Sequence, residues 1–203
     1  MSDQLIERIV RHEWDQFQRT NNEGGRAACQ CNWPVFRQMR TSQFMTWPDP
    51  LLDSYLADLA EAERVGRNLV TEKYGRMMES TAPQDFHDNI EPHIPRLSDE
   101  RIATQERVIA TQVAWAEDFR ARYPKLGRAM RVLRTAEDTA QSTSFETYLR
   151  GELGTYSERT MALYRHFVDD LLRKGRNLTE ETIAHTVALG GFADLAEAEA
   201  AQG

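Results

Sequence analysis

Apolar residues that recur every three or four positions through most of the chain are the feature that most constrains its fold. The pattern is clearest over residues 5–17, where the apolar members are Leu5, Ile6, Ile9, Val10, Trp14 and Phe17. No alternation of apolar and polar residues persists long enough to predict a strand. The sequence therefore predicts an all-α fold, a single compact, bundle-like domain of five to seven helices that covers residues 1–203.

Glycine and proline divide this pattern into segments. Gly24-Gly25 and the stretch 47–50 (Trp-Pro-Asp-Pro) mark the ends of the first two helices. The predicted helices cover residues 3–19, 34–47, 51–80, 98–123, 143–174, 179–189 and 194–201. The helix at 143–174 can divide near Ser157, residues 81–97 are predicted to be a proline-rich loop, and residues 193–203 carry a short tail helix.

Ionisable side chains interrupt the apolar faces. At about 100° per residue, Glu13 falls about 80° from Leu5, within the apolar side of the first helix. Burying an unpaired charge costs several kcal/mol or more, so such a carboxylate needs a cation, a metal or a proton. Later helices show the same exception at Arg40 with Gln43, at Glu63 with Arg67 one turn on, and at Glu152. If these faces meet, Glu13, Arg40, Glu63, Arg67 and Glu152 lie at or near one core, which is our central hypothesis.

A converging set of this kind has a chemical and a structural interpretation. In the first, Arg40 or Arg67 binds a substrate carboxylate or phosphate, because a guanidinium makes a two-pronged contact with such groups. Glu13 or Glu152, its pKa raised by burial, would then transfer a proton. In the second, the same residues form an ion-pair network that only orders the helices.

A metal site in a helical bundle is a further alternative. Di-metal carboxylate bundles need Glu-x-x-His motifs, and the chain contains none. His166 and Asp170 are one helical turn apart, but two ligands do not make a site. We therefore assign no metal ligands and identify no cofactor, since G-x-G-x-x-G and Walker A patterns are also absent.

Composition excludes several classes of partner. A net charge of −7 argues against a general nucleic-acid binder, which needs a basic face. No apolar run approaches the roughly 18 residues of a membrane span, and the start MSDQLIERIV does not resemble a signal peptide. The cysteines, Cys29 and Cys31, are too close for a stabilising disulfide and too few for a zinc site. A reducing cytoplasm is the expected location.

Several short motifs of the sequence occur together in one known family. They are Glu13-Trp14, Gly24-Gly25-Arg26-Ala27 with Cys29-Gln30, Met39-Arg40 with Ser42-Gln43, Gly66-Arg67-Asn68-Leu69, Glu72-Lys73-Tyr74, and residues 146–153 (ETYLRGEL) with Thr155-Tyr156-Ser157. Over nearly its whole length the chain resembles a bacterial domain-of-unknown-function family, the one numbered 4125. The resemblance implies a compact prokaryotic cytoplasmic domain and brings no established activity.

The resemblance also implies that any family-wide site lies among the polar residues of these motifs rather than at Glu63, His87 or His93. We predict catalytic roles for Glu13, Glu152 and Tyr156, and substrate binding by Arg26, Gln30, Arg40, Gln43 and Arg67. The expected function is an enzyme that acts on a small polar, anionic metabolite by acid–base chemistry. The alternatives are a non-catalytic helical module that senses a ligand or binds a protein, and a non-haem metal enzyme. Assembly into a homo-oligomer is left open.

Overall fold

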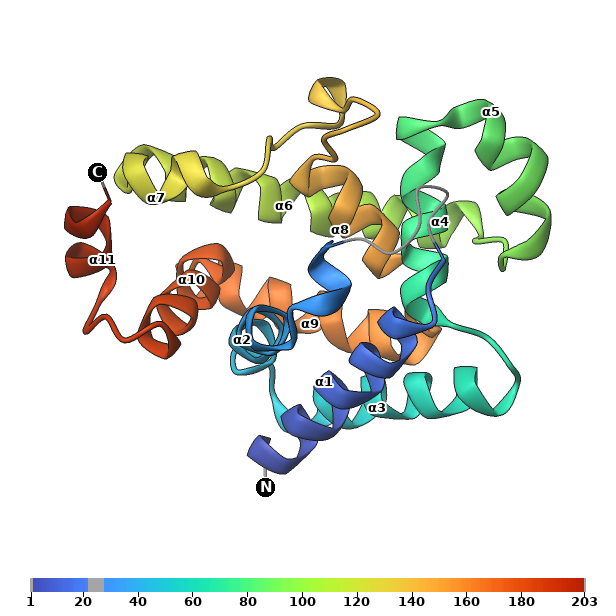
Figure 1. Cartoon of the computed structure of the whole chain (residues 1–203), viewed down its shortest axis with the longest axis horizontal. Helices are drawn as coiled ribbons and strands as arrows, with labels where there is room; N and C mark the ends of the chain where they lie inside the picture. Colours follow the sequence, from blue (N-terminus) through green and yellow to red (C-terminus); the bar gives the residue numbers. More distant parts are fainter. Residues whose placement is uncertain (1, 22–27, 203) are drawn as a thin grey trace.

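The computed structural model describes residues 2–21 and 28–202, and every regular element within these ranges is helical (Figure 1). The all-α prediction is confirmed, but the described residues form eleven α-helices rather than five to seven. The helices are α1 (Ser2–Gln18), α2 (Trp33–Phe44), α3 (Asp49–Arg64), α4 (Leu69–Thr81), α5 (Pro83–Asp85), α6 (Asp99–Arg122), α7 (Pro124–Ala129), α8 (Phe145–Leu153), α9 (Glu158–Arg173), α10 (Leu178–Leu189) and α11 (Leu195–Ala201). Shorter helical turns are η1 (Ala28–Cys31), η2 (Phe86–Ile90), η3 (Glu91–His93) and η4 (Thr135–Glu137).

The long helix predicted over residues 51–80 is in fact two helices, α3 and α4. Gly66 lies between them with φ of +75°, a left-handed conformation that ends a helix and that glycine adopts without strain. Asn68 then begins α4, because its side chain accepts a hydrogen bond from the backbone N–H of Thr71. The break changes the direction of the chain and restarts the helical phase.

The predicted loop at 81–97 is more helical than expected, since it contains α5, η2 and η3. Pro83 and Pro92 lie in the first turns of two of these pieces, where a missing backbone N–H costs nothing. The predicted division at Ser157 is confirmed, because the Ser157 hydroxyl caps α9. The tail helix is α11.

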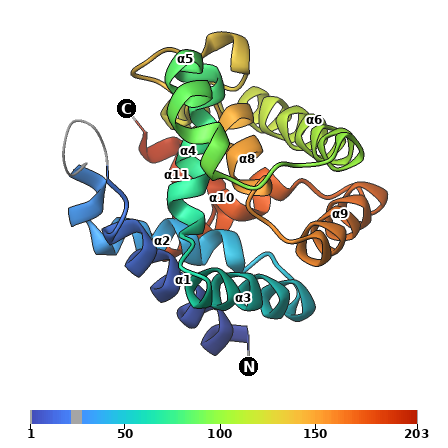
Figure 2. The same cartoon turned by 90° about the vertical axis from the view of Figure 1, so that its right-hand side faces the viewer.

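The main core lies where α1, α3, α6, α8 and α9 pack together. Ile9, Leu52, Val113 and Leu153, one from each of four helices, have no exposed surface. Figure 2 shows α4 standing upright beside α8, and these two helices are in extensive contact. Burial of these apolar faces is the main force that holds the helices together.

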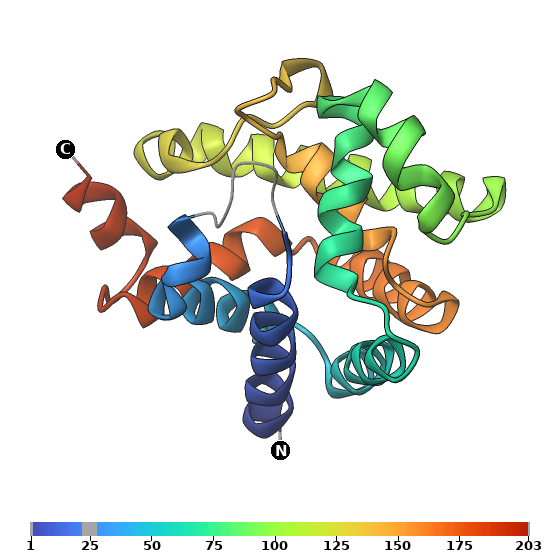
Figure 3. The ribbon, with the colours of Figure 1, turned by 45° about the vertical axis from the view of Figure 1, so that its right-hand side comes forward.

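A smaller core lies at the C-terminal end of the chain. Phe119 of α6 packs there with Val187 of α10 and with Leu195 and Ala198 of α11. Figure 3 shows α10 and α11 leading away from the main bundle towards α7. No helix in the described part of the chain has the length and apolar character to cross a membrane.

Candidate functional site

The first part of the site joins α1 to α2. Arg40 of α2 donates two hydrogen bonds to the Glu13 carboxylate of α1, from Nη2 to Oε1 at 2.6 Å and from Nε to Oε2 at 2.7 Å. The Glu13 side chain is only 3% exposed and that of Arg40 12% exposed. A two-pronged contact of this geometry is the strongest form of ion pair between protein side chains.

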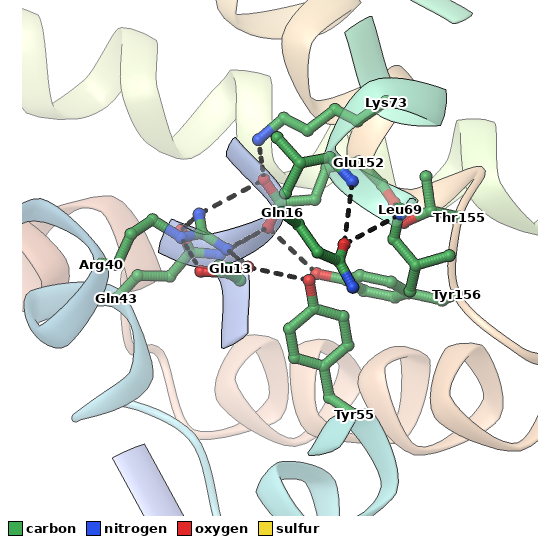
Figure 4. Close-up of polar contacts among 11 residues, drawn as sticks. Glu13, Gln16, Arg40, Gln43, Tyr55, Leu69, Lys73, Glu152, Thr155 and Tyr156 are labelled. Carbon is green, nitrogen blue, oxygen red and sulfur yellow. Dashed lines mark hydrogen bonds and ion pairs between the residues drawn. The ribbon is translucent and has the colours of Figure 1, made fainter. Parts of the chain in front are cut away.

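The second part brings in α4 and α8. Glu152 of α8 accepts a hydrogen bond from Lys73 Nζ of α4 at 2.5 Å and lies 3.2 Å from Arg40 Nη2. Its Oε1 atom also accepts from Gln43 Nε2 at 2.9 Å and from the Tyr156 hydroxyl at 3.1 Å. Figure 4 shows these side chains reaching one another from separate helices. Two carboxylates and two cations thus form one buried network, hereafter the Glu13–Arg40–Glu152–Lys73 network.

Two tyrosines complete the network as donors. The Tyr55 hydroxyl of α3 donates to Glu13 Oε1 at 2.8 Å, as Tyr156 does to Glu152. Burial, together with the neighbouring carboxylate charges, raises the pKa of both phenols well above the usual value. Both tyrosines therefore stay protonated and act as hydrogen-bond donors.

The network fixes the charges of Glu152 and Arg40. Burial alone would raise the pKa of Glu152, but Arg40 and Lys73 outweigh it and hold this pKa far below its usual range. The expectation of a raised pKa at Glu152 is therefore wrong. Burial likewise tends to lower the pKa of Arg40, yet Glu13 and Glu152 raise it well above its usual value. Glu152 is a fixed anion and Arg40 a fixed cation.

A cavity borders this network. Its volume is about 30 Å³, room for one or two water molecules, and it is partly open to the surface. Its polar wall includes Glu13, Arg40, Glu152 and Lys73. The remaining wall is largely aromatic and consists of Phe17, Phe36, Tyr55, Tyr74 and Tyr148 with Leu69, Val70 and Thr155. The cavity can therefore admit the polar end group of a small molecule.

Tyr148 differs from the other tyrosines because two cations flank its ring. Lys73 Nζ lies 3.7 Å and Arg131 Cζ lies 4.5 Å from the ring centroid. Burial would raise the pKa of Tyr148, but the charges of Lys73 and Arg40 and a hydrogen bond from Lys73 together outweigh burial, and the pKa lies below its usual value. Tyr148 is therefore the phenol of the site best suited to give up a proton.

Close packing of α8 against α4 places Lys73 beside Glu152. A Cβ atom on Gly151 would lie 2.7 Å from the backbone oxygen of Lys73, so only glycine allows this approach. Gln16 of α1 secures the start of α4, because its Oε1 atom accepts from the backbone N–H groups of Leu69 and Val70. These contacts set the positions of α4 and α8, which carry Lys73 and Glu152.

Five of the predicted site residues meet in the network: Glu13, Arg40, Gln43, Glu152 and Tyr156. Of these, Gln43 and Tyr156 lie behind the ion pairs and do not line the cavity.

The other predicted residues do not join them. Gln30 is buried, but its amide donates to the backbone oxygens of Phe17 and Thr20 and holds η1 against the end of α1. Arg67 is 40% exposed and pairs with Glu72, while Glu63 is exposed and contacts Arg19 at the surface. Arg26 lies outside the described residues.

Sequence reasoning missed Tyr55, Lys73 and Tyr148. No site role was predicted for Glu72 or Lys73, yet both are buried. The usable signal was Asn68: a capping residue after Gly66 restarts the helical phase and turns Lys73 inward.

Within residues 2–21 and 28–202, no group of three or more His, Cys, Asp and Glu side chains is arranged to hold a metal ion.

Comparisons with known proteins give one result. Neither the curated proteins nor the solved structures provide a match to the chain. Residues 3–200, nearly the whole chain, match the model of a family described as "Protein of unknown function (DUF4125)". The chain is therefore a member of the DUF4125 family.

Proposed function

We propose that the protein is an enzyme that acts on a small polar, anionic molecule whose end group enters the cavity and contacts Lys73. The observation that carries this proposal is the unused hydrogen-bonding capacity of Lys73. Arg40 has five N–H donors and makes five hydrogen bonds, to Glu13, Gln43 and Glu152. The Lys73 ammonium has three donors; among the described residues it donates to Glu152 and interacts with the Tyr148 hydroxyl, which leaves one donor for a ligand.

The charge pattern supports an anionic substrate. Within the network two carboxylates balance two cations, so the network itself has no net charge. Arg131 adds a further positive charge at the Tyr148 ring, and it forms no ion pair with the described residues. The side of the cavity near Tyr148 is therefore positive, which favours an acceptor oxygen with negative charge.

In this proposal the chemistry lies with Lys73 and Tyr148, which face the cavity. Tyr148, with its lowered pKa, exchanges a proton with the substrate, and Lys73 binds a substrate oxygen. Glu13, Glu152 and Tyr156 act as positioning residues, since they hold Arg40 and Lys73 in place. This assignment transfers the acid–base role from the glutamates to Tyr148.

A thermal-shift screen of small carboxylic acids, oxo acids and phosphates tests the proposal. A ligand at 100 times its Kd stabilises the protein by about 2.7 kcal/mol, which such a screen detects. Lys73→Met should abolish the shift, whereas Lys174→Met, at a side chain that is 62% exposed just after the end of α9, should leave it intact. A shift that survives Lys73→Met would place binding elsewhere and contradict the proposal.

A second candidate function is a non-catalytic module that binds a partner protein. It is favoured by the complete pairing of Arg40 and by exposed apolar side chains on α2 and α10, namely Val35, Met39 and Leu189. Helices α2 and α10 pack against each other. If no small molecule binds and Met39→Asp changes the state of association in sedimentation, this function is preferred over the enzyme.

A further inference from the structure

Lysine is rare in this chain, and one lysine is in an unusual place. Only three of its 25 Lys and Arg residues are lysines. Lys174 is exposed and pairs with Asp170, and Lys125 donates to the backbone oxygen of Gln202. Lys73 alone is buried, with 9% of its side chain exposed. A chain that uses arginine for nearly every cation thus has a lysine at the cavity, where the two residues differ chemically.

The difference is that an amine can lose its proton and a guanidinium cannot. Lysine becomes a nucleophile when it is desolvated or lies near other cations. Lys73 is buried, and the carboxylate that it contacts, Glu152, also contacts Arg40. Lys73 and Tyr148 both line the cavity, and the Nζ atom lies 3.7 Å from the centre of the Tyr148 ring, so a substrate in the cavity would lie beside the amine.

We propose that Lys73 forms an imine with the aldehyde or ketone group of the substrate. This inference rests on the proposed function and names the substrate class of the same site. The substrate is a small polar carbonyl compound, and a negatively charged group on it would lie towards Arg131.

The reaction balances without a further reagent. The Lys73 ammonium first loses a proton to water at the cavity, and the Nζ lone pair then forms a bond to the carbonyl carbon. The electron pair of the C=O bond moves to oxygen, which takes a proton from the Tyr148 hydroxyl. Nitrogen then gives one of its two protons to the Tyr148 phenolate and keeps the other. The oxygen takes back the proton first released to water and leaves as water, which yields the iminium. In total, one ammonium and one carbonyl give one iminium and one water.

Glu152 can stabilise both the reactant and the product of this reaction. Its carboxylate lies 2.5 Å from Nζ and pairs with the ammonium before the reaction. The iminium has the same single positive charge at the same atom, so Glu152 can pair with the product as well. Because Arg40, Gln43 and Tyr156 also hold Glu152, the anion stays in place throughout.

Reductive trapping tests the inference in the full-length protein. The protein is incubated with glycolaldehyde or pyruvate and sodium cyanoborohydride, and modified lysines are located by peptide mass spectrometry. Lys73 should be modified at least about tenfold faster than Lys125 and Lys174, because only Lys73 has a built site around it. A Lys73 that is modified no faster than the two other lysines overturns the inference.

Two variants sharpen this experiment. In the double variant Lys125→Arg with Lys174→Arg, Lys73 is the sole side-chain amine. Modification of Lys73 can then be measured from the mass of the intact protein, once modification of the N-terminal amine has been measured on the N-terminal peptide and subtracted. This readout does not require a folded Lys73 variant. Tyr148→Phe should slow trapping at Lys73 at least about tenfold, in the usual range for removal of a general acid. An unchanged rate would remove Tyr148 from the reaction.

The trapping result is separable from the proposed function. If an acid or phosphate stabilises the protein through Lys73 but no carbonyl compound is trapped, the enzyme proposal stands and the imine is refuted. If neither binding nor trapping involves Lys73, both proposals fail.

Discussion

Replacing Arg40 by alanine removes the centre of the buried network. Among the described residues, Glu13 would keep only the Tyr55 hydroxyl as a side-chain donor, and both Glu13 and Glu152 would remain buried. Removing one partner of a buried ion pair costs about 3–5 kcal/mol, because an uncompensated charge stays behind. We therefore expect Arg40→Ala to lower the free energy of unfolding by about 3–5 kcal/mol.

Arg37 provides a matched control on the same helix. It lies one turn before Arg40 in α2, is 56% exposed, and makes a single contact of 3.4 Å to Glu7. Exposed ion pairs contribute about 0–1 kcal/mol, so Arg37→Ala should cost less than about 1 kcal/mol. Both substitutions remove the same atoms from one helix. The difference between their effects on the free energy of unfolding therefore measures the contribution of the buried network.

Urea unfolding followed by tryptophan fluorescence and circular dichroism measures both variants. Adding Glu13→Gln to Arg40→Ala should recover part of the loss, because a neutral amide replaces the stranded carboxylate. The reasoning is refuted if Arg40→Ala costs no more than Arg37→Ala.

Two other predictions concern Glu152 and Gly151. Although burial opposes it, Arg40 and Lys73 hold the pKa of Glu152 below its usual 4.5, so its contribution to stability is present above this pH and is lost as the pH falls below it. Unfolding free energies measured against pH should therefore fall more steeply for the wild type than for Glu152→Gln, by up to about 1.4 kcal/mol per pH unit; equal slopes would mean that Glu152 has no depressed pKa. Gly151→Ala should cost about 1–3 kcal/mol in urea unfolding, because its methyl group would meet the α4 backbone. A variant as stable as the wild type would show that α4 and α8 are further apart.

Helical periodicity was enough to predict which of several ionisable residues are buried together. Glu13, Arg40 and Glu152 each lie in the apolar face of an unbroken helix, so the phase measured from neighbouring apolar residues remains valid at the charge. The cost of an unpaired buried charge then requires that such residues meet. This argument uses only local spacing, and the structure brings the three together.

The same argument failed where the helix was broken. Arg67 was assigned from a phase that began at Leu52, but α3 ends at Arg64 and α4 starts afresh at Leu69. Arg67 therefore lies at the surface between the two helices, and Lys73 turns inward instead. Glu63 is still within α3, but it lies in the last turn, where its side chain is exposed and contacts Arg19. Tyr148 could not be predicted by these means. The two cations that flank its ring, Lys73 and Arg131, lie outside its own helix, and helical spacing does not show that they are close to it.

The central claim is that side chains from separate helices form one buried, charged network beside a cavity. Nitrogen NMR of protein labelled with ¹⁵N only at lysine tests it directly, because the chain has just three lysines. Ammonium protons of exposed lysines exchange rapidly with water, whereas those of a buried, hydrogen-bonded lysine are protected. We predict one protected ammonium signal near neutral pH, retained in Lys125→Arg with Lys174→Arg and lost in Glu152→Gln. The absence of a protected signal, or one that persists unchanged in Glu152→Gln, would contradict the account.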